Sequence, residues 1–308
     1  MPHDHPHHGH HHHQDLHGGG DSAIGWAVAV NLLLTAAQIA GGLSADSTAL
    51  IADGIHNLSD ALALVLAFGA RRLARRAPTP DYSYGWGRAE IVAAFVNYLA
   101  LIAVSVWLAV EAVGRLADPP PVAGGMVMAL AGLALIVDLA TAALVWRMAR
   151  DSVNIRAAFL HNLADAGVSV AVLVGGALIV TFGWLRADPL LTLVISGVIL
   201  WHVVQGIGPI LRILMLAAPP GSDPEGVMAA LRDLPGVSGA HHLHLWQIDE
   251  RRHAASVHLV VPAAGDFVPV TEAAKALLSK RFGIAHATIE IETMAEAADP
   301  NHTSARAH

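Results

Sequence analysis

The sequence predicts a polytopic α-helical membrane protein that carries a small soluble α+β domain near its C-terminal end. Three observations lead to this fold class. Of the 308 residues, 54% are hydrophobic and only 14% are charged, which is too apolar for a soluble chain of this length. Six separate apolar segments each approach the ~20 residues needed to span the hydrocarbon of a bilayer. After residue 219 the composition becomes that of a soluble domain.

These changes in composition predict four regions. A His-rich tail at 1–21 precedes a membrane domain at 22–214, and a soluble domain at 219–294 precedes a polar tail at 295–308. Both tails lack the apolar residues needed to build a core, so we expect them to be disordered. In the first tail, Asp, Pro and Gly interrupt the histidines, which favours a metal-gathering segment over a purification tag. This tail does not resemble a cleavable signal peptide.

The membrane domain is predicted to contain six spans. They are placed at about 23–43, 47–71, 89–113, 123–147, 156–181 and 189–213. Arginines gather after the second, fourth and sixth spans, whereas the other connections carry little positive charge. Because cytoplasmic connections are enriched in Lys and Arg, both termini are predicted to be cytoplasmic and successive spans antiparallel. The excess of Arg over Lys and the abundance of Ala hint at a bacterial genome, and for a bacterial membrane protein of this kind we expect the inner membrane.

The soluble domain is predicted to have the element order αββαβ. Its helices are expected at 224–234 and 268–281, and its strands, which alternate in hydrophobicity, at 241–248, 255–261 and 287–292. This order predicts a small open-faced sheet with two helices on one side. A domain of this size has a thin core, so dimerisation would help to stabilise it.

A short motif of histidine and aspartate occurs twice within the spans. His56-Asn-Leu-Ser-Asp60 lies in the second span and His161-Asn-Leu-Ala-Asp165 in the fifth. A spacing of four residues puts both groups on one helix face, about 6 Å apart along the axis. Because these spans are antiparallel, His56 would lie level with Asp165 and Asp60 level with His161, as in an inverted-repeat transporter. Two nitrogens and two oxygens make a tetrahedral set suited to Zn²⁺.

The energetic argument favours a metal over static hydrogen bonding between the helices. Each ionisable group at the centre of a span costs about 2.5–3.5 kcal/mol, whereas an interhelical hydrogen bond returns only about 0.6 kcal/mol. A divalent cation would neutralise both carboxylates and use both imidazoles. Since protons compete for these ligands near histidine's ordinary pKa of about 6.5, the site predicts exchange of metal for protons. Asp53 and Asp138, also within the spans, are candidates for proton coupling or for support of the ligands. The alternative for Asp53 is ordinary polarity at the start of a helix near the outer face, and for Asp138 a hydrogen bond to a neighbouring helix.

Other function classes fit the sequence less well. A membrane metalloenzyme would need an open metal position and a general base, and the sequence has no His-Glu-x-x-His motif. A channel needs weaker, multiply occupied sites, and a metal-buffering protein would depend on the His-rich tail. The net charge of −7 argues against a nucleic-acid partner, and the absence of cysteine excludes thiolate sites. We therefore expect a secondary transporter that is not an enzyme and needs no cofactor.

Four motifs together carry a resemblance to one family. They are ADGIHNLSD at 52–60, YSYGWGRAE at 82–90, HNLAD at 161–165 and HHLHLW at 241–246. Through them the chain resembles the cation diffusion facilitator family over roughly residues 22–294, and within it the zinc-transporting branch. The resemblance implies a homodimer in the lipid bilayer, a cytoplasmic ferredoxin-like domain and metal export in exchange for protons. It implies Zn²⁺ as the substrate, with Cd²⁺ and Co²⁺ as further candidates.

The resemblance also implies a regulatory zinc site in the soluble domain. By match to the family pattern, its ligands are His241, His258 and Glu292. His242 stands where the family usually has Asp, which leaves the ligand set open. The alternative ligands are His244 and His286. In the competing interpretation, these histidines only alternate along exposed strand faces. The family's additional site between spans two and three is not expected, because this loop has no histidine.

Overall fold

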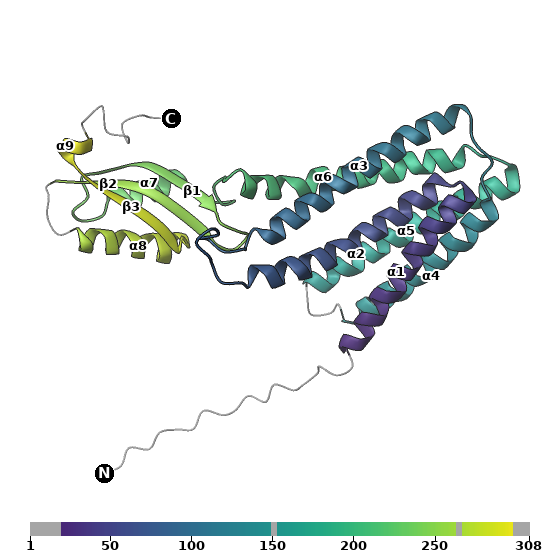
Figure 1. Cartoon of the computed structure of the whole chain (residues 1–308), viewed down its shortest axis with the longest axis horizontal. Coiled ribbons are helices and arrows are strands. Elements are labelled where there is room, and N and C mark those ends of the chain that lie inside the picture. Colours follow the sequence, from purple (N-terminus) through teal and green to yellow (C-terminus); the bar gives the residue numbers. More distant parts are fainter. Residues whose placement is uncertain (1–19, 149–152, 263–266, 298–308) are drawn as a thin grey trace, which may run out of the picture. The chain divides into compact units, whose positions relative to one another are not determined.

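The computed structural model describes residues 20–148, 153–262 and 267–297. These residues form a set of long helices followed by a small α+β domain (Figure 1), which confirms the predicted fold class. The predicted tails at 1–21 and 295–308 lie outside the described residues, apart from their few residues next to the folded part.

The long helices extend slightly beyond most of the predicted spans, with lengths of 25 to 30 residues. They are α1 (Gly20–Ala45), α2 (Thr48–Ala74), α3 (Ala89–Ala117), α4 (Gly124–Met148), α5 (Val153–Phe182) and α6 (Ala187–Leu214). Within the described residues, α2 to α6 are long and apolar enough to cross a membrane, and α1 contributes the shorter apolar stretch Ala29–Ala45. The chain is an integral membrane protein.

The chain divides into two compact units, and each contains parts of several helices. One unit holds the residues up to 61 together with 104–199, and the other holds 62–103 and 200–308. The repeated His-Asp motif therefore lies entirely in the first unit, and the soluble domain lies entirely in the second.

Glycines allow two pairs of helices in the first unit to pack closely. A Cβ added at Gly176 of α5 would lie 3.1 Å from the carbonyl oxygen of Gly124 in α4. A Cβ added at Gly54 of α2 would lie 2.9 Å from Ile39 Cγ1 of α1. Small residues at such contacts are typical of helix packing in membranes. They bring α1 against α2 close to the first copy of the motif.

The soluble domain has the predicted αββαβ order and ends in a short extra helix. Its elements are α7 (Pro224–Arg232), β1 (Gly239–Gln247), β2 (His253–Val261), α8 (Val268–Phe282), β3 (His286–Thr293) and α9 (Met294–Ala297). The sheet order is β1-β2-β3, with β1 antiparallel and β3 parallel to β2. Residues of α7 and α8, such as Leu231 and Leu278, share one core with Val257 and Leu259 of β2. Because strand side chains alternate, His258 belongs to the other face of the sheet.

Candidate functional site

The structure brings both copies of the His-Asp motif together between α2 and α5. Nε2 of His56 lies 3.4 Å from Asp165 Oδ1 and 3.7 Å from Asp60 Oδ2. Nε2 of His161 lies 3.1 Å from Asp60 Oδ2 and 3.6 Å from Asp165 Oδ2. Each imidazole therefore reaches a carboxylate on both helices, and its closest carboxylate is the one on the opposite helix.

These distances are close to the edge lengths of a zinc coordination tetrahedron, with the two histidines facing different oxygens of Asp165. Zinc binds His nitrogen and carboxylate oxygen at about 2.0–2.2 Å, and a tetrahedron with arms of that length has edges of roughly 3.3–3.6 Å. The four nitrogen–oxygen distances run from 3.1 to 3.7 Å. One ligand atom each from His56, Asp60 and Asp165 also fall within 4.8 Å of one another. His161 is not part of this group of three, so side-chain movement is needed to bring all four ligand atoms around one cation.

The four side chains differ strongly in exposure. Asp165 and His56 expose 11% and 20% of their side chains, whereas Asp60 and His161 expose 38% and 51%. The group is thus closed around Asp165 and open at His161. A cation could enter or leave on the His161 side without displacing the buried carboxylate.

Asp53 lies on α2 one turn before His56 and is almost completely buried, with 1% of its surface exposed. Gln38 of α1 donates a hydrogen bond from Nε2 to Asp53 Oδ2 at 2.6 Å. Asn57, also on α2, donates to Oε1 of the same Gln38 at 3.2 Å. Gln38 therefore joins α1 to α2 and holds the Asp53 carboxylate beside the first motif.

Asp138 of α4 is held in a similar way from α5. Ser169 donates a hydrogen bond from Oγ to Asp138 Oδ2 at 2.9 Å, and both residues are buried. Ser169 lies four residues after Asp165, on the same face of α5. Each helix of the motif thus has a buried carboxylate on or beside it that accepts a hydrogen bond from a neutral side chain. For α2 this is Asp53 with Gln38, and for α5 it is Asp138 with Ser169.

Asp188, which our sequence analysis missed, fixes the beginning of α2. Its carboxylate accepts hydrogen bonds from the backbone N–H of Thr48 at 2.9 Å and of Ala49 at 3.4 Å. The hydroxyls of Ser47 and Thr48 donate to the same carboxylate. Ser47 Oγ in turn accepts the N–H of Leu50 at 3.1 Å. Ser47 before an apolar run is an ordinary N-cap signal, but nothing local in the sequence indicates a cap from a residue 140 positions away.

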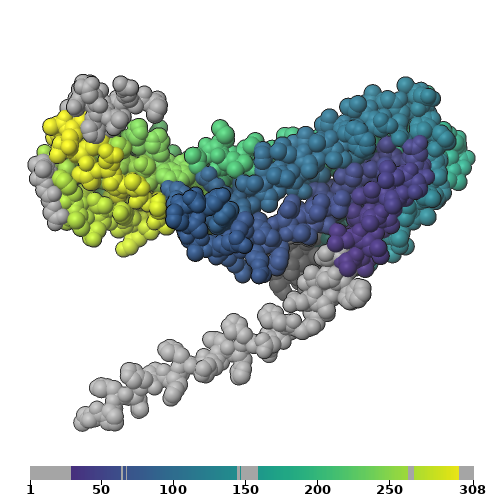
Figure 2. All heavy atoms as spheres, in the orientation of Figure 1, coloured from purple at the N-terminus to yellow at the C-terminus, as the bar shows by residue number. Residues whose placement is uncertain are grey.

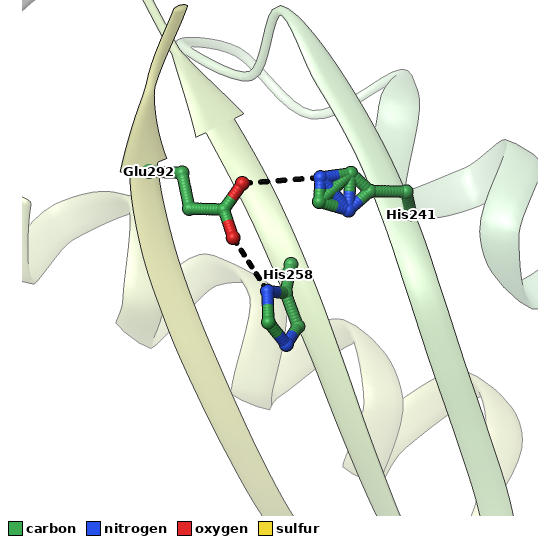
Figure 3. Close-up of side chains that lie close together, drawn as sticks. All are labelled: His241, His258 and Glu292. Carbon is green, nitrogen blue, oxygen red and sulfur yellow. Dashed lines mark hydrogen bonds and ion pairs between the residues drawn. The ribbon is translucent and has the colours of Figure 1, made fainter. Parts of the chain in front are cut away.

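A second group of possible metal ligands lies on the sheet of the soluble domain (Figure 3). Glu292 of β3 points between two histidines, with Oε2 3.1 Å from His241 Nε2 and Oε1 2.6 Å from His258 Nδ1. The Glu292 side chain is only 1% exposed. A buried carboxylate between two imidazoles on three adjacent strands is a donor set that fits a divalent cation.

A bulge in β1 shapes this group. His241 pairs with His258 and His244 pairs with Ser256, so one extra residue is inserted between them, and His242 has a left-handed φ of 56°. The bulge turns the His242 ring toward His258, with centroids 5.0 Å apart. His244 packs against His242 on the exposed side of the strand, at 4.7 Å. His286 lies at the start of β3 against Tyr84, away from Glu292.

The YSYGWGRAE motif forms a loop that packs on the turn between β1 and β2. Arg88 donates from Nε to the carbonyl of Ile248 at 2.9 Å and from Nη2 to that of Gln247 at 3.0 Å. Arg252 of the turn donates to the carbonyl of Tyr84 at 3.2 Å. In Figure 2, the blue atoms of this loop adjoin the green atoms of the soluble domain. A Cβ added at Gly87 would clash with the side chains of Asp249 and Arg252, which would have to shift to make room for it.

Asp249 organises the turn from within. Partial burial would raise the pKa of this carboxyl, but the backbone N–H groups of Arg251 and Arg252 and the Arg252 guanidinium stabilise its charged form, so its pKa lies below the ordinary value of 3.8. The Arg252 Nε to Asp249 Oδ2 distance is 2.6 Å. Asp249 is therefore ionised at neutral pH and holds the turn in the shape that the loop contacts.

Both the long helices and the soluble domain match known protein families. Residues 26–215 match the family described as the cation efflux transmembrane domain, and residues 219–294 match the cytoplasmic domain of cation efflux proteins. The zinc transporter ZitB of Escherichia coli (strain K12) is 32% identical over 257 residues, which cover 83% of this chain and 82% of ZitB. The cadmium, cobalt and zinc/H(+)-K(+) antiporter of Bacillus subtilis (strain 168) is 32% identical over 275 residues, covering 86% and 85% of the two chains. A solved structure described as the metal-bound C-terminal domain of the CzcD transporter from Cuprividus metallidurans is 29% identical over 23% of this chain and 99% of its own, with a TM-score of 0.22.

Proposed function

Because the chain belongs to the cation efflux family, also called the cation diffusion facilitator family, we propose that it exports Zn²⁺ in exchange for protons through the site between α2 and α5. Divalent metal efflux follows from the family and from the relatives' names. Zinc as the main cargo, protons as the counter-ion and the identity of the ligands are our proposals. Cd²⁺ and Co²⁺ are further proposed substrates, in line with the name of the Bacillus subtilis relative.

The observation that carries the proposal is the alternating arrangement of His56, Asp165, His161 and Asp60. Its nitrogen–oxygen distances of 3.1 to 3.7 Å suit a tetrahedral ion with borderline-soft character. Mg²⁺ and Ca²⁺ prefer six or more oxygen ligands, so two imidazoles in a four-ligand set favour Zn²⁺, Cd²⁺ or Co²⁺.

Proton exchange follows from the chemistry of the same ligands. Zinc requires both carboxylates ionised and both imidazoles unprotonated at the coordinating nitrogen. The site with zinc bound then has no net charge. When the ion departs, protons can replace it on the same four groups. We propose that Asp53 and Asp138 assist this exchange, either by carrying protons or by supporting the ligands through Gln38 and Ser169.

We further propose that the protein lies in a bacterial inner membrane as a homodimer, with both termini in the cytoplasm. The asymmetry of loop arginines supports this orientation, and the small core of the soluble domain favours association of two copies. In this domain, His241, His258 and Glu292 would bind Zn²⁺ as a regulatory ligand. His242 on the bulge is the nearest further imidazole.

Transport by purified protein in proteoliposomes tests the proposal. Zn²⁺ movement should be accompanied by proton movement in the opposite direction and should respond to an imposed pH gradient. Asp60→Ala and Asp165→Ala should each abolish transport, while Asp118→Ala, at an exposed carboxylate outside the helices, should leave it unchanged. Transport that ignores the pH gradient would exclude antiport, and transport that survives Asp60→Ala would exclude this ligand set.

The proton-coupling role of Asp53 is separated from a ligand-supporting role by comparing two measurements. Asp53→Asn keeps the shape of the side chain and its contact with Gln38 but cannot carry a proton. If Asp53 carries protons, zinc binding is retained and the ratio of protons to zinc changes. If it only supports the ligands, zinc affinity falls and the ratio is unchanged.

A further inference from the structure

We propose that an arginine-lined pocket next to the end of α2 binds the phosphate-bearing head group of an anionic phospholipid. The pocket has a volume of about 570 Å³ and lies between the last turns of α2, the loop before α3 and the turn between β1 and β2. All of these segments belong to the second unit. The pocket is distinct from both groups of possible metal ligands, and the proposal is independent of the transport site.

The pocket carries an excess of positive charge that the protein itself does not neutralise. Five arginines line it against three acidic residues. The arginines are Arg71, Arg75, Arg76, Arg251 and Arg252. Arg71 pairs with Glu90 at 3.8 Å and Arg252 with Asp249 at 2.6 Å. In the part of the chain that the structure describes, the guanidinium groups of the other three make no hydrogen bond or ion pair.

The chemistry of these side chains favours phosphate over other anions. The guanidinium group is planar and presents N–H donors as a fork that matches two phosphate oxygens. All the basic residues of the pocket are arginine, with no lysine among its lining residues. Several guanidinium groups facing one pocket, in a chain whose net charge is −7, form a local site for a phosphate group.

The position of the pocket favours a lipid over a free phosphate ion. Arg71 lies in the last turn of α2, directly after apolar side chains that are exposed: Val65 by 59% and Phe68 by 72%. A ligand with acyl chains could lie along these side chains while its head group reaches the arginines. Trp86 also lines the pocket, and tryptophan is enriched where membrane meets water. Basic clusters next to the cytoplasmic end of a membrane helix typically bind anionic lipids.

Binding of phospholipids to the purified full chain in detergent, measured by native mass spectrometry, tests this site. Phosphatidylglycerol should bind more tightly than phosphatidylcholine. Arg75→Gln and Arg251→Gln should each lower the affinity for phosphatidylglycerol about fivefold, which corresponds to about 1 kcal/mol per basic residue at a membrane surface. Arg75→Lys keeps the charge but loses the fork, so it should fall between the wild type and Arg75→Gln.

Arg72→Gln is the matched control. Arg72 is an exposed arginine on the same helix, but it does not line the pocket, so its loss should change the affinity less than twofold. Arg251→Gln is the complementary test variant, because Arg251 lies on the turn of the soluble domain and not on the membrane helix. The thermal unfolding midpoint of each variant verifies that it is folded.

Four results would overturn the proposal. An equal loss of affinity in Arg72→Gln and Arg75→Gln would show attraction to general surface charge, as would unchanged binding in Arg251→Gln. If inorganic phosphate binds with the same sensitivity to Arg75→Gln while phosphatidylglycerol binds no better than phosphatidylcholine, the ligand is a free phosphate. If glycerol phosphate, which lacks acyl chains, binds as tightly as phosphatidylglycerol, a lipid ligand is excluded in the same way.

Discussion

The carboxylate of Asp188, at the start of α6, accepts the backbone N–H of Thr48, the first residue of α2, at 2.9 Å. The N-terminus of α2, the helix that carries His56 and Asp60, is thus capped by a carboxylate from α6. A carboxylate at a helix N-terminus satisfies orphan N–H groups and interacts favourably with the helix dipole. His56 lies eight residues further along α2, about 12 Å from this anchor, so the cap fixes the axial position of the first motif.

Replacement of Asp188 should therefore weaken both the fold and the site. Asp188→Ala leaves the buried N–H of Thr48 and the hydroxyl of Ser47 without their acceptor, which should lower stability by about 1–3 kcal/mol. Thermal unfolding in detergent measures this loss, and zinc titration should show a weaker transport site. Asp118→Ala, at an exposed carboxylate, is the control. An Asp188→Ala variant as stable as the control would contradict the capping role.

Zinc affinity of the transport site should fall steeply as the pH drops through the range near 6.5 in which histidine ordinarily titrates. For each proton that zinc must displace, the zinc affinity falls up to about tenfold for each unit by which the pH is lowered. For two imidazoles, the fall is therefore up to about 100-fold per pH unit. Calorimetric titration from pH 8 to pH 5.5 measures this, in a Glu292→Ala background that removes the second group of ligands. A zinc affinity independent of pH in this range would rule out direct competition at His56 and His161.

Zinc should also stabilise the soluble domain through Glu292. In an Asp60→Ala background, which removes the transport site, a zinc concentration about 100 times the dissociation constant should stabilise the fold by about 2.7 kcal/mol. Glu292→Gln should abolish the zinc-induced rise in the unfolding midpoint, because it removes the buried carboxylate between His241 and His258. Glu272→Gln, at an exposed residue of α8, should keep the full response. An undiminished rise in Glu292→Gln would place the ligands elsewhere.

Asp249 should contribute to stability only while it is ionised. Its hydrogen bonds from Arg251 and Arg252 hold the pKa of the folded carboxyl below 3.8, so its contribution is complete above that value and is lost as the pH falls through the lowered pKa. Asp249→Asn should be less stable than the wild type at pH 7 by roughly 1 kcal/mol. The difference between the two proteins should shrink as the pH is lowered from 4 toward 2. A difference that stays constant over this range would mean that the charge of Asp249 is not the cause.

Several features could be predicted because their causes are local in the sequence. Apolar segments of membrane-spanning length predict the long helices, and alternation of side chains predicts the three strands. The four-residue spacing within each motif puts His and Asp on one helix face whatever the rest of the chain does. The asymmetry of loop charges then predicts that His56 faces Asp165. In the structure, His56 Nε2 and Asp165 Oδ1 lie 3.4 Å apart.

Other features depend on contacts between residues far apart in the chain, and only the tertiary structure decides them. The cap of α2 by Asp188, the bonds from Arg88 to the carbonyls of Gln247 and Ile248, and the position of Arg251 beside the arginines at the end of α2 each join segments more than 130 residues apart. The bulge at His242 depends on the register of β1 against β2. The sequence by itself determined the helices, the strands and the motifs, because hydrophobic periodicity acts within a few residues. The partners of each buried polar group were decided by packing, because burial obliges such a group to find a partner wherever the fold brings one.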